Sequence, residues 1–429
     1  MPCFAEGLRW LFQKFRDISE GMQENPISFV GWERVIIRGQ AKIWAMSRFL
    51  VLLLAALLIL PVRAQTLVGF ARFPANSFVP GPTSGQRLEV KDGLVALPFQ
   101  NKQPIQGFSS LWRLSKTEFL ALEDNGYGAK GNSDDFLLRV VRVKVDFKTP
   151  KGGAGTVRVV SSVELKDPKK LVNWPLVRAD RQLTGADFDP ESLVVTRDKT
   201  WWLGDEFGPF LLHFNAEGEL LEAPFALSGV ASPDDPLGRQ ANIKSSRGFE
   251  GLGLWPNQLY LYPLLEGALN GDDPNRLPMY QFDLYPGLTT FHSFSAPPNF
   301  YQLEPVGPDE KPHSIGECVC VDYGKFLINE RDDLGGDSAR FKRVYLWDQY
   351  PNSKTLVADL LNILDPNGLG PSQKGIYRMQ FQTIESVVMV DKRHLLLCND
   401  NNYPFGRGRG ADHIEDTEFV LLELDKPLF

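Results

Sequence analysis

The chain has 429 residues, of which 43% are hydrophobic and 23% are charged, the ordinary balance of a soluble globular protein. Its formal net charge is −7 at neutral pH, which argues against nucleic acid as a partner, because a phosphate backbone requires a basic footprint. A small phosphate ester held by a metal ion and a few local cations is not excluded. The 29 phenylalanines, 38 glycines and 31 prolines favour an all-β chain with many turns.

The N-terminal part of the sequence contains an export signal that begins well after the first methionine. A charged start at Met46 precedes an apolar run over residues 49–62, and a small-residue cleavage site ends at Ala64. The run has 14 residues, which is short for a membrane span of about 20. We therefore predict a signal peptide over 46–64 and an exported protein, periplasmic or secreted, with no stable membrane span after cleavage. Residues 1–45 are interpreted as an upstream extension from a wrongly assigned start codon.

One pattern recurs along the rest of the chain. A short apolar strand carries an acid near its start, a turn follows, and a second apolar strand ends in another acid. The clearest copy has Glu250 in the first strand and Glu266 after the second. The corresponding first positions elsewhere are Ser109, Glu191, Glu317 and Glu385, at steps of 59 to 82 residues. Repeats of this length, built from short strands, are typical of a β-propeller.

We therefore predict that residues 65–429 form one all-β domain, a β-propeller. The repeat count gives five blades, or six if residues 66–106 supply additional strands. A strand over 67–73 is expected to pair with a strand over 418–424 and to close the ring, which removes a free sheet edge. Because the innermost strands line a central channel, acids that recur at one place in every unit should converge at its mouth.

The recurring carboxylates are the first candidates for chemistry. Many stand beside apolar strand residues, where an ionised carboxylate is costly unless it is paired, hydrogen-bonded or bound to a metal. Hard oxygen ligands suit Ca²⁺, or alternatively Mg²⁺, rather than zinc or copper. The predicted metal ligands are Glu123, Asp124, Asp205, Glu206, Glu266, Glu330, Asp332 and Asp400. The predicted catalytic carboxylates are Glu191, Glu250, Glu317 and Glu385.

Basic residues near these acids are candidates for binding a phosphate group. They are Arg247, Arg331, Lys342 and Arg343. An arginine beside a glutamate suits a structural ion pair equally well, because the same bidentate geometry serves both uses. The five histidines show no metal-binding spacing, and no G-x-S-x-G turn supports a serine esterase.

At these residues the sequence resembles the phytase-like family, whose members are named for an esterase-like activity of phytase. The matching strings include 107–109, 123–130, 183–192, 204–211, 245–251, 262–267, 329–332, 340–345 and 399–402. The resemblance covers residues 66–426 and implies hydrolysis of phosphate monoesters or diesters and an export signal. Metal-site motifs of a true β-propeller phytase are absent, and Ser109 replaces an acid in the first unit, so phytate specificity does not follow.

The sequence therefore predicts an exported hydrolase of small phosphate esters. A divalent metal would bridge the clustered carboxylates and lower the pKa of an attacking water. Arg247 and Arg331 would bind phosphate oxygens, and Glu250 or Glu317 would act as general base. The alternative is a non-catalytic propeller that binds a ligand or protein at the channel mouth, with structural Ca²⁺ or with acids that brace the turns. The sequence does not set the substrate, the metal or the oligomeric state.

Overall fold

The computed structural model describes residues 65–429 except 91–92, 285–291, 308, 408 and 411–412. The predicted signal peptide and upstream extension therefore lie outside the described residues. All that follows concerns one compact unit of the chain, Arg63–Phe429. In its described ranges, no helix is long and apolar enough to cross a membrane.

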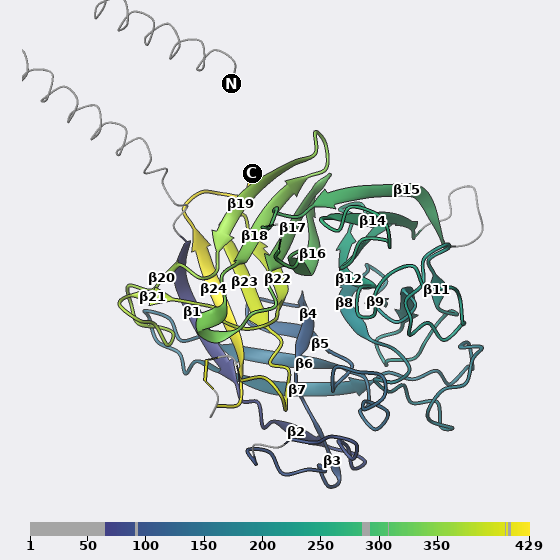
Figure 1. Cartoon of the computed structure of the whole chain (residues 1–429). Helices are drawn as coiled ribbons and strands as arrows, with labels where there is room; N and C mark the ends of the chain where they lie inside the picture. The colour runs from purple at the N-terminus through teal and green to yellow at the C-terminus, as the bar shows by residue number, and fades with distance from the viewer. Residues whose placement is uncertain (1–64, 91–92, 285–291, 308, 408, 411–412) are drawn as a thin grey trace, which may run out of the picture. The chain divides into compact units, whose positions relative to one another are not determined.

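Most strands of the described chain are antiparallel and form four-stranded units (Figure 1). The first unit comprises β4 (Phe108–Arg113), β5 (Glu118–Glu123), β6 (Arg139–Asp146) and β7 (Thr156–Glu164). The second comprises β8 (Pro190–Val195), β9 (Trp201–Asp205), β10 (Phe210–Phe214) and β11 (Phe225–Ala226). The third comprises β12 (Phe249–Leu254), β13 (Tyr260–Leu265), β14 (Arg276–Asp283) and β15 (Ser293–Gln302). The fourth comprises β16 (Ser314–Asp322), β17 (Lys325–Arg331), β18 (Lys342–Asp348) and β19 (Ser353–Asp359).

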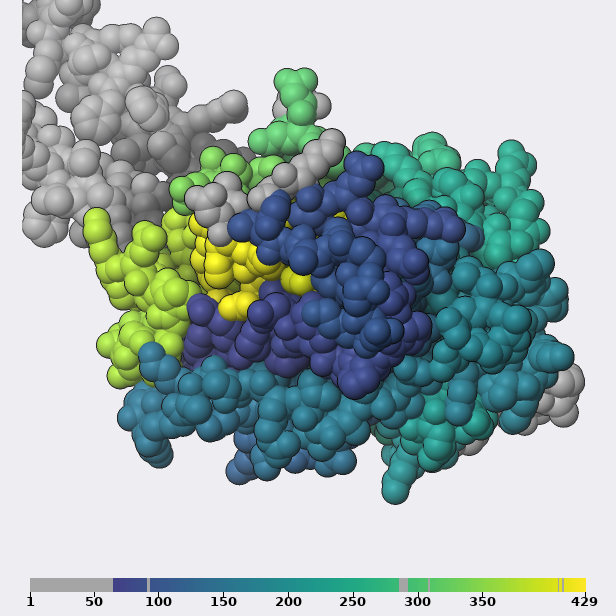
Figure 2. Space-filling model, turned by 90° about the horizontal axis from the view of Figure 1, so that it is seen from below, coloured from purple at the N-terminus to yellow at the C-terminus, as the bar shows by residue number. Residues whose placement is uncertain are grey.

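The last unit joins the two ends of the described chain. It comprises β22 (Ile384–Asp391), β23 (His394–Asn399), β24 (Thr417–Leu424) and β1 (Gln65–Phe73). Strand β1 pairs antiparallel with β24, which confirms the predicted closure, and Figure 2 shows these purple and yellow segments side by side. Short elements lie outside the units: β2 (Phe78–Pro80), β3 (Lys102–Pro104), β20 (Ile363–Leu364), β21 (Ile376–Tyr377) and the 3-10 turn η1 (Gly336–Ser338).

The first strand of each unit is the innermost, and the innermost strands follow one another in a ring. Strand β4 contacts β8, β8 contacts β12, β12 contacts β16, β16 contacts β22, and β22 returns to β4. The protein is therefore a β-propeller, as predicted. The blade number stays a prediction, because one continuous sheet runs through the first and last units by way of a parallel bridge between β1 and β7.

Strand sequences reflect where each strand lies. In β6, buried valines alternate with exposed Arg142 and Lys144, the two-residue period of a strand with one solvated face. In β9, near the centre of its unit, all five residues from Trp201 to Asp205 are buried. Apolar side chains of neighbouring units pack face to face, as Leu122 and Val140 of the first unit do with a cluster from β8–β10. These cores hold the inner strands in place.

A β-bulge stands at the beginning of every innermost strand. The pairing of the first strand with the second skips one residue in each unit: Ser109, Glu191, Glu250, Gly316 and Glu385. A bulge redirects a side chain out of the normal alternation of the strand. The bulge therefore sets which side chains face the channel mouth.

The bulges correct one sequence alignment. The repeat spacing placed Glu317 in the same position as Glu250, but the bulge residue of the fourth unit is Gly316. A Cβ atom at residue 316 would lie 2.1 Å from the carbonyl oxygen of Ile384 and 2.6 Å from Oε2 of Glu385. Glycine is therefore required there, and the acid stands one residue later. The sequence spacing could not reveal a shift of one residue.

Candidate functional site

Eight carboxylates gather where the innermost strands begin and the second strands end. We call this set the acid cluster: Asp124, Asp189, Glu191, Glu206, Glu250, Glu266, Glu385 and Asp400. All but Asp124 and Glu191, which are half-buried, are at least nine-tenths buried. Glu191, Glu250 and Glu385 are bulge residues. Asp124, Glu206, Glu266 and Asp400 each follow the last residue of a second strand. The equivalent position of the fourth unit holds Arg331.

One group within the acid cluster consists of Asp124, Asp189 and Glu191. One carboxylate oxygen from each lies within 4.8 Å of the others. Burial raises the pKa of all three carboxyls, and the proximity of Asp124 raises the pKa of Asp189 and Glu191 further. Asp189 was not among the predicted site residues, although it stands two positions before Glu191. Its string Asp189-Pro190-Glu191 could have identified it, because a turn proline fixes the two acids at one strand start.

A second group within the acid cluster consists of Glu206, Glu250 and Glu266, with one carboxylate oxygen of each again within 4.8 Å of the others. Burial raises the pKa of Glu250 well above its ordinary value, and the nearby Glu266 and Glu385 carboxyls add to that rise. The pKa of Glu206 is raised by burial and by Glu266. These three groups cannot all be ionised without a compensating positive charge.

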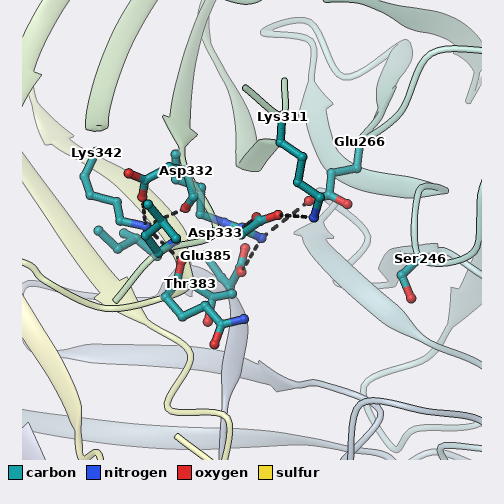
Figure 3. A network of polar contacts seen from close by, with 12 residues as sticks. Ser246, Glu266, Lys311, Asp332, Asp333, Lys342, Thr383 and Glu385 are labelled. Atoms are coloured by element: carbon teal, nitrogen blue, oxygen red, sulfur yellow. Dashed lines mark hydrogen bonds and ion pairs between the residues drawn. The ribbon is translucent and has the colours of Figure 1, made fainter. Parts of the chain in front are cut away.

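Two arginines supply part of that charge. Arg331 donates from Nη2 to Oε1 of Glu385 at 3.1 Å and to Oε1 of Glu266 at 3.4 Å. Its Nη1 donates to Oδ1 of Asp333 at 2.8 Å. Arg247 contacts Glu266 from the other side. Figure 3 shows Glu266, Asp333 and Glu385 gathered around these contacts, with Asp332 and Lys342 in a neighbouring group.

The donor set of the acid cluster fits a hard divalent cation. Buried oxygens Oδ1 of Asp189, Oε1 of Glu206 and Oε2 of Glu385 have no hydrogen-bond partner among the described residues. A buried carboxylate oxygen without a partner loses its hydration without replacement, at a cost of about 1–3 kcal/mol or more. Carboxylate oxygens from several strands are the ligands that Ca²⁺ prefers, with Mg²⁺ as the smaller alternative. The residues therefore fit such an ion.

Several predicted metal ligands lie outside the acid cluster and brace individual units. Glu123 faces Arg139 at 3.4 Å inside the first unit, and its burial raises the carboxyl pKa to about 8. Asp205 accepts hydrogen bonds from the backbone N–H groups of Asp189 and Gly208, each at 2.8 Å. These two acids belong to the buried ends of second strands.

The predicted site residues of the fourth unit also form hydrogen bonds or ion pairs with partners outside the acid cluster. Glu330 accepts hydrogen bonds from Lys354 at 2.6 Å and from the backbone N–H of Glu304 at 3.0 Å. Asp332 pairs with Lys342 at 2.8 Å. Arg343 approaches Asp359 at 3.9 Å. Among the predicted phosphate-binding residues, Arg247 and Arg331 lie at the acid cluster, whereas Lys342 and Arg343 have partners elsewhere.

Glu317 lies further along the channel than the acid cluster. Its Oε2 accepts a hydrogen bond from Oγ of Ser110 at 2.8 Å, and its Oε1 from the backbone N–H of Cys318 at 3.0 Å. Burial raises its pKa to about 8. It lines an apolar cavity of about 280 Å³ to which all the innermost strands contribute, through residues such as Leu111, Val194, Leu252, Val319 and Val387.

Two cavities reach the acid cluster from outside. One of about 580 Å³ is lined by Asp124, Tyr127, Asn402, Tyr403 and Glu415. The other, of about 480 Å³, is lined by Arg247, Glu266, Lys311 and His313, among others. Both are large enough to admit a small organic ester, so Asp124 and Glu266 are reachable from these cavities.

Comparison with known proteins agrees with the resemblance seen in the sequence. Residues 103–403 match the phytase-like family, which is described as having the esterase-like activity of phytase. The chain belongs to this family. Every member of the acid cluster lies within the matched range. Family membership makes a hydrolase the first function to consider for this channel.

A relative and several solved structures are also similar. An uncharacterized secreted protein of Arthroderma benhamiae is 30% identical over 194 residues, 36% of each chain. A luciferin-regenerating enzyme is 11% identical with a TM-score of 0.35, covering 84% of this chain and 92% of that one. A gluconolactonase of Xanthomonas campestris is 13% identical with a TM-score of 0.30, covering 72% and 68%. These scores are too low to bear on function.

Proposed function

We propose that the protein is an exported hydrolase of phosphate esters. Hydrolysis would take place at the acid cluster with a bound divalent cation, for which Ca²⁺ is the first candidate. The observation that carries this proposal is the convergence of eight carboxylates, three of them with buried oxygens that lack a partner in the described structure. The esterase-like description of the family supports hydrolysis. The predicted signal over 46–64 and the secreted relative support export.

Two groups within the acid cluster would hold the ion. Asp124, Asp189 and Glu191 form one set of ligands, and Glu206 and Glu266, which lie beside Glu250, form the other. A cation bound there would supply positive charge that stabilises the charge developing on a phosphoryl group. Arg247, which contacts Glu266 and lines a cavity, would contact phosphate oxygens.

The general base is best assigned to Glu250. It is the bulge residue that lies beside Glu206 and Glu266. Burial and the neighbouring carboxylates raise its pKa, so the protonated form of the side chain is favoured. Glu317 is the weaker candidate, because its two oxygens already accept hydrogen bonds from Ser110 and Cys318 away from the cluster. Glu250 would take the proton of the attacking water, and the ester oxygen would leave with a proton from solvent.

The competing interpretation is a non-catalytic binding propeller. It is favoured by Arg331, whose guanidinium is already engaged by Glu266, Asp333 and Glu385. In that case the acid cluster and Arg331 would form a purely structural network at the channel mouth.

The test is an assay of protein stripped with chelator. Release of p-nitrophenol is measured from bis-p-nitrophenyl phosphate, p-nitrophenyl phosphate and p-nitrophenyl acetate, with and without Ca²⁺, Mg²⁺ or Mn²⁺. Metal-dependent turnover of either phosphate ester, and its loss in Glu250→Gln, is the expected result. Absence of turnover on all three, with Ca²⁺ raising the melting temperature, would replace the hydrolase by the binding propeller.

A further inference from the structure

A second group of metal-type side chains lies outside the acid cluster. It consists of His213 on β10, Glu222 between β10 and β11, and His292 immediately before β15. One ligand atom from each lies within 4.8 Å of the other two. None of the three lines the cavities that reach the acid cluster. The sequence spacing of the histidines gave no hint of this group, because the two come from different units.

The three side chains point toward one another. Oε2 of Glu222 lies 2.7 Å from Nδ1 of His213 and 2.9 Å from Nδ1 of His292. A simple ion pair needs one histidine, whereas here two imidazoles share a single carboxylate oxygen.

Aromatic packing fixes the orientation of both imidazoles. The ring of His213 stacks on Trp202 with centroids 4.1 Å apart and an interplanar angle of 12°. His292 meets the edge of Trp202 at 5.3 Å and also packs against Phe225 at 5.9 Å. Ligands whose orientation is set by their surroundings bind a metal with little loss of side-chain freedom.

The ligand types indicate a different metal from that of the acid cluster. Two imidazole nitrogens and one carboxylate suit a borderline transition-metal ion, Zn²⁺ above all, rather than Ca²⁺. In a tetrahedral zinc site with bonds of about 2.0–2.1 Å, ligand atoms are about 3.3 Å apart. The observed distances of 2.7 and 2.9 Å would have to open by about half an ångström to reach that spacing. The side chain of Glu222 is 39% exposed, which leaves solvent access for a fourth ligand.

We propose that His213, Glu222 and His292 form a zinc site that ties the second unit of the propeller to the third. The ion would join the loop after β10 to the chain entering β15. Its role would be structural, because the site reaches neither the channel nor its cavities. An ion that binds only the folded protein stabilises it by mass action, and this stabilisation grows with the logarithm of the ratio of the free zinc concentration to the dissociation constant.

The experiment is a calorimetric titration of the purified protein with Zn²⁺ in saturating Ca²⁺, which keeps the acid cluster occupied by a hard ion. The expected result is one Zn²⁺ per chain, with an affinity that falls at least 100-fold in His292→Gln and in Glu222→Gln. Co²⁺ in place of Zn²⁺ should give a visible absorption band in the wild type that both variants lose. The Glu222→Gln variant keeps both imidazole rings and their aromatic contacts, so a loss of Zn²⁺ binding in it is not explained by unfolding.

The matched control is His394→Gln. His394 pairs with Asp391 alone at an exposed turn, and it should leave the Zn²⁺ affinity unchanged. Equal Zn²⁺ affinity in wild type, His292→Gln and Glu222→Gln would overturn the proposal, as would the absence of stoichiometric binding to a folded wild-type protein. Neither result would bear on hydrolysis at the acid cluster, which is measured separately.

Discussion

The mouth and the deeper part of the propeller channel are lined by the same strands but differ in chemistry. At the mouth, bulge residues and the residues after the second strands contribute the acid cluster. A few residues further along, the same strands contribute apolar side chains and a single acid, Glu317. The difference arises from the bulge, which turns one residue per strand out of its normal alternation. Function at this mouth therefore depends on backbone register as much as on residue type.

The two parts also differ in how their acids are compensated. Glu317 has a hydrogen-bond donor for each oxygen, so it is stable as a lone buried carboxyl. The acid cluster has several mutually repelling carboxylates and contacts to Arg247 and Arg331 that offset part of the charge. The acid cluster, with its surplus of buried negative charge, is expected to bind a cation. Glu317, whose two oxygens both accept hydrogen bonds, is not. Each prediction below tests one side of this contrast.

The largest expected effect is on turnover. Glu250→Gln should lower phosphate-ester hydrolysis by about 100- to 10,000-fold, the usual range for loss of a general base. The melting temperature should stay the same or rise, because one repelling carboxylate is removed. The measurement is kcat on the phosphate ester that the wild type turns over, alongside thermal unfolding.

Glu317→Gln is the matched control for that experiment. It makes the same chemical change on an innermost strand but outside the acid cluster, so turnover should be retained. Equal loss in both variants would show that the mouth and the deeper channel are not functionally distinct.

The next effect is on stability. Arg331→Met would leave Glu266 and Glu385 without their shared buried partner and should destabilise the protein by about 3–5 kcal/mol. Arg343→Met, which removes a partly exposed contact at 3.9 Å, should cost no more than about 1 kcal/mol. Denaturant unfolding of both variants gives the comparison. A similar small cost for both would mean that the acid cluster does not depend on Arg331 for compensation.

A third effect concerns the cation. Ca²⁺ at 100 times its dissociation constant should stabilise the wild type by about 2.7 kcal/mol, and chelator should reverse it. Glu206→Gln removes one oxygen ligand with an unpartnered atom, so it should weaken this response. The readout is the free energy of unfolding against Ca²⁺ concentration. An unchanged response in Glu206→Gln would place the ion elsewhere.

The last prediction is a pH slope from Glu317. Its pKa is about 8 in the folded protein and near the ordinary glutamate value when unfolded, so the folded state binds more protons between about pH 4.5 and 8. The contribution of Glu317 to the free energy of unfolding is therefore fully present below about pH 4.5. It falls as the pH rises towards 8, by at most about 1.4 kcal/mol per pH unit. Glu317→Gln should flatten the slope measured by denaturant unfolding at several pH values. A slope identical to that of the wild type would show that Glu317 does not carry the raised pKa.

Much of the fold was predictable because it repeats. The recurrence of strand, acid, turn and strand indicated a propeller, and the apolar ends of the domain indicated closure by β1 and β24. The acids at bulges and after second strands were predictable for the same reason. Glu123, Asp205 and Glu330 were not separable from their neighbours, because adjacent residues at a strand end face opposite sides of the sheet and the sequence does not say which side is the channel.

Other parts depend on contacts between distant segments. Asp189 joins Asp124 from another unit, and His213 meets His292 across 79 residues of chain. The one-residue offset at Gly316 follows from lack of room beside Ile384, which no local pattern records. Such contacts become visible only when neighbouring units are packed together.

The most direct test of the central claim is to locate a cation at the acid cluster. Crystals of the protein grown with Mn²⁺ would be measured at the manganese absorption edge. The account predicts an anomalous peak within about 2.2 Å of carboxylate oxygens from Glu206 and Glu266, or from Asp124, Asp189 and Glu191. The absence of a peak at both sets, with Glu266 and Glu385 still bound only by arginines, would contradict it. The acids would then have a structural role between propeller units.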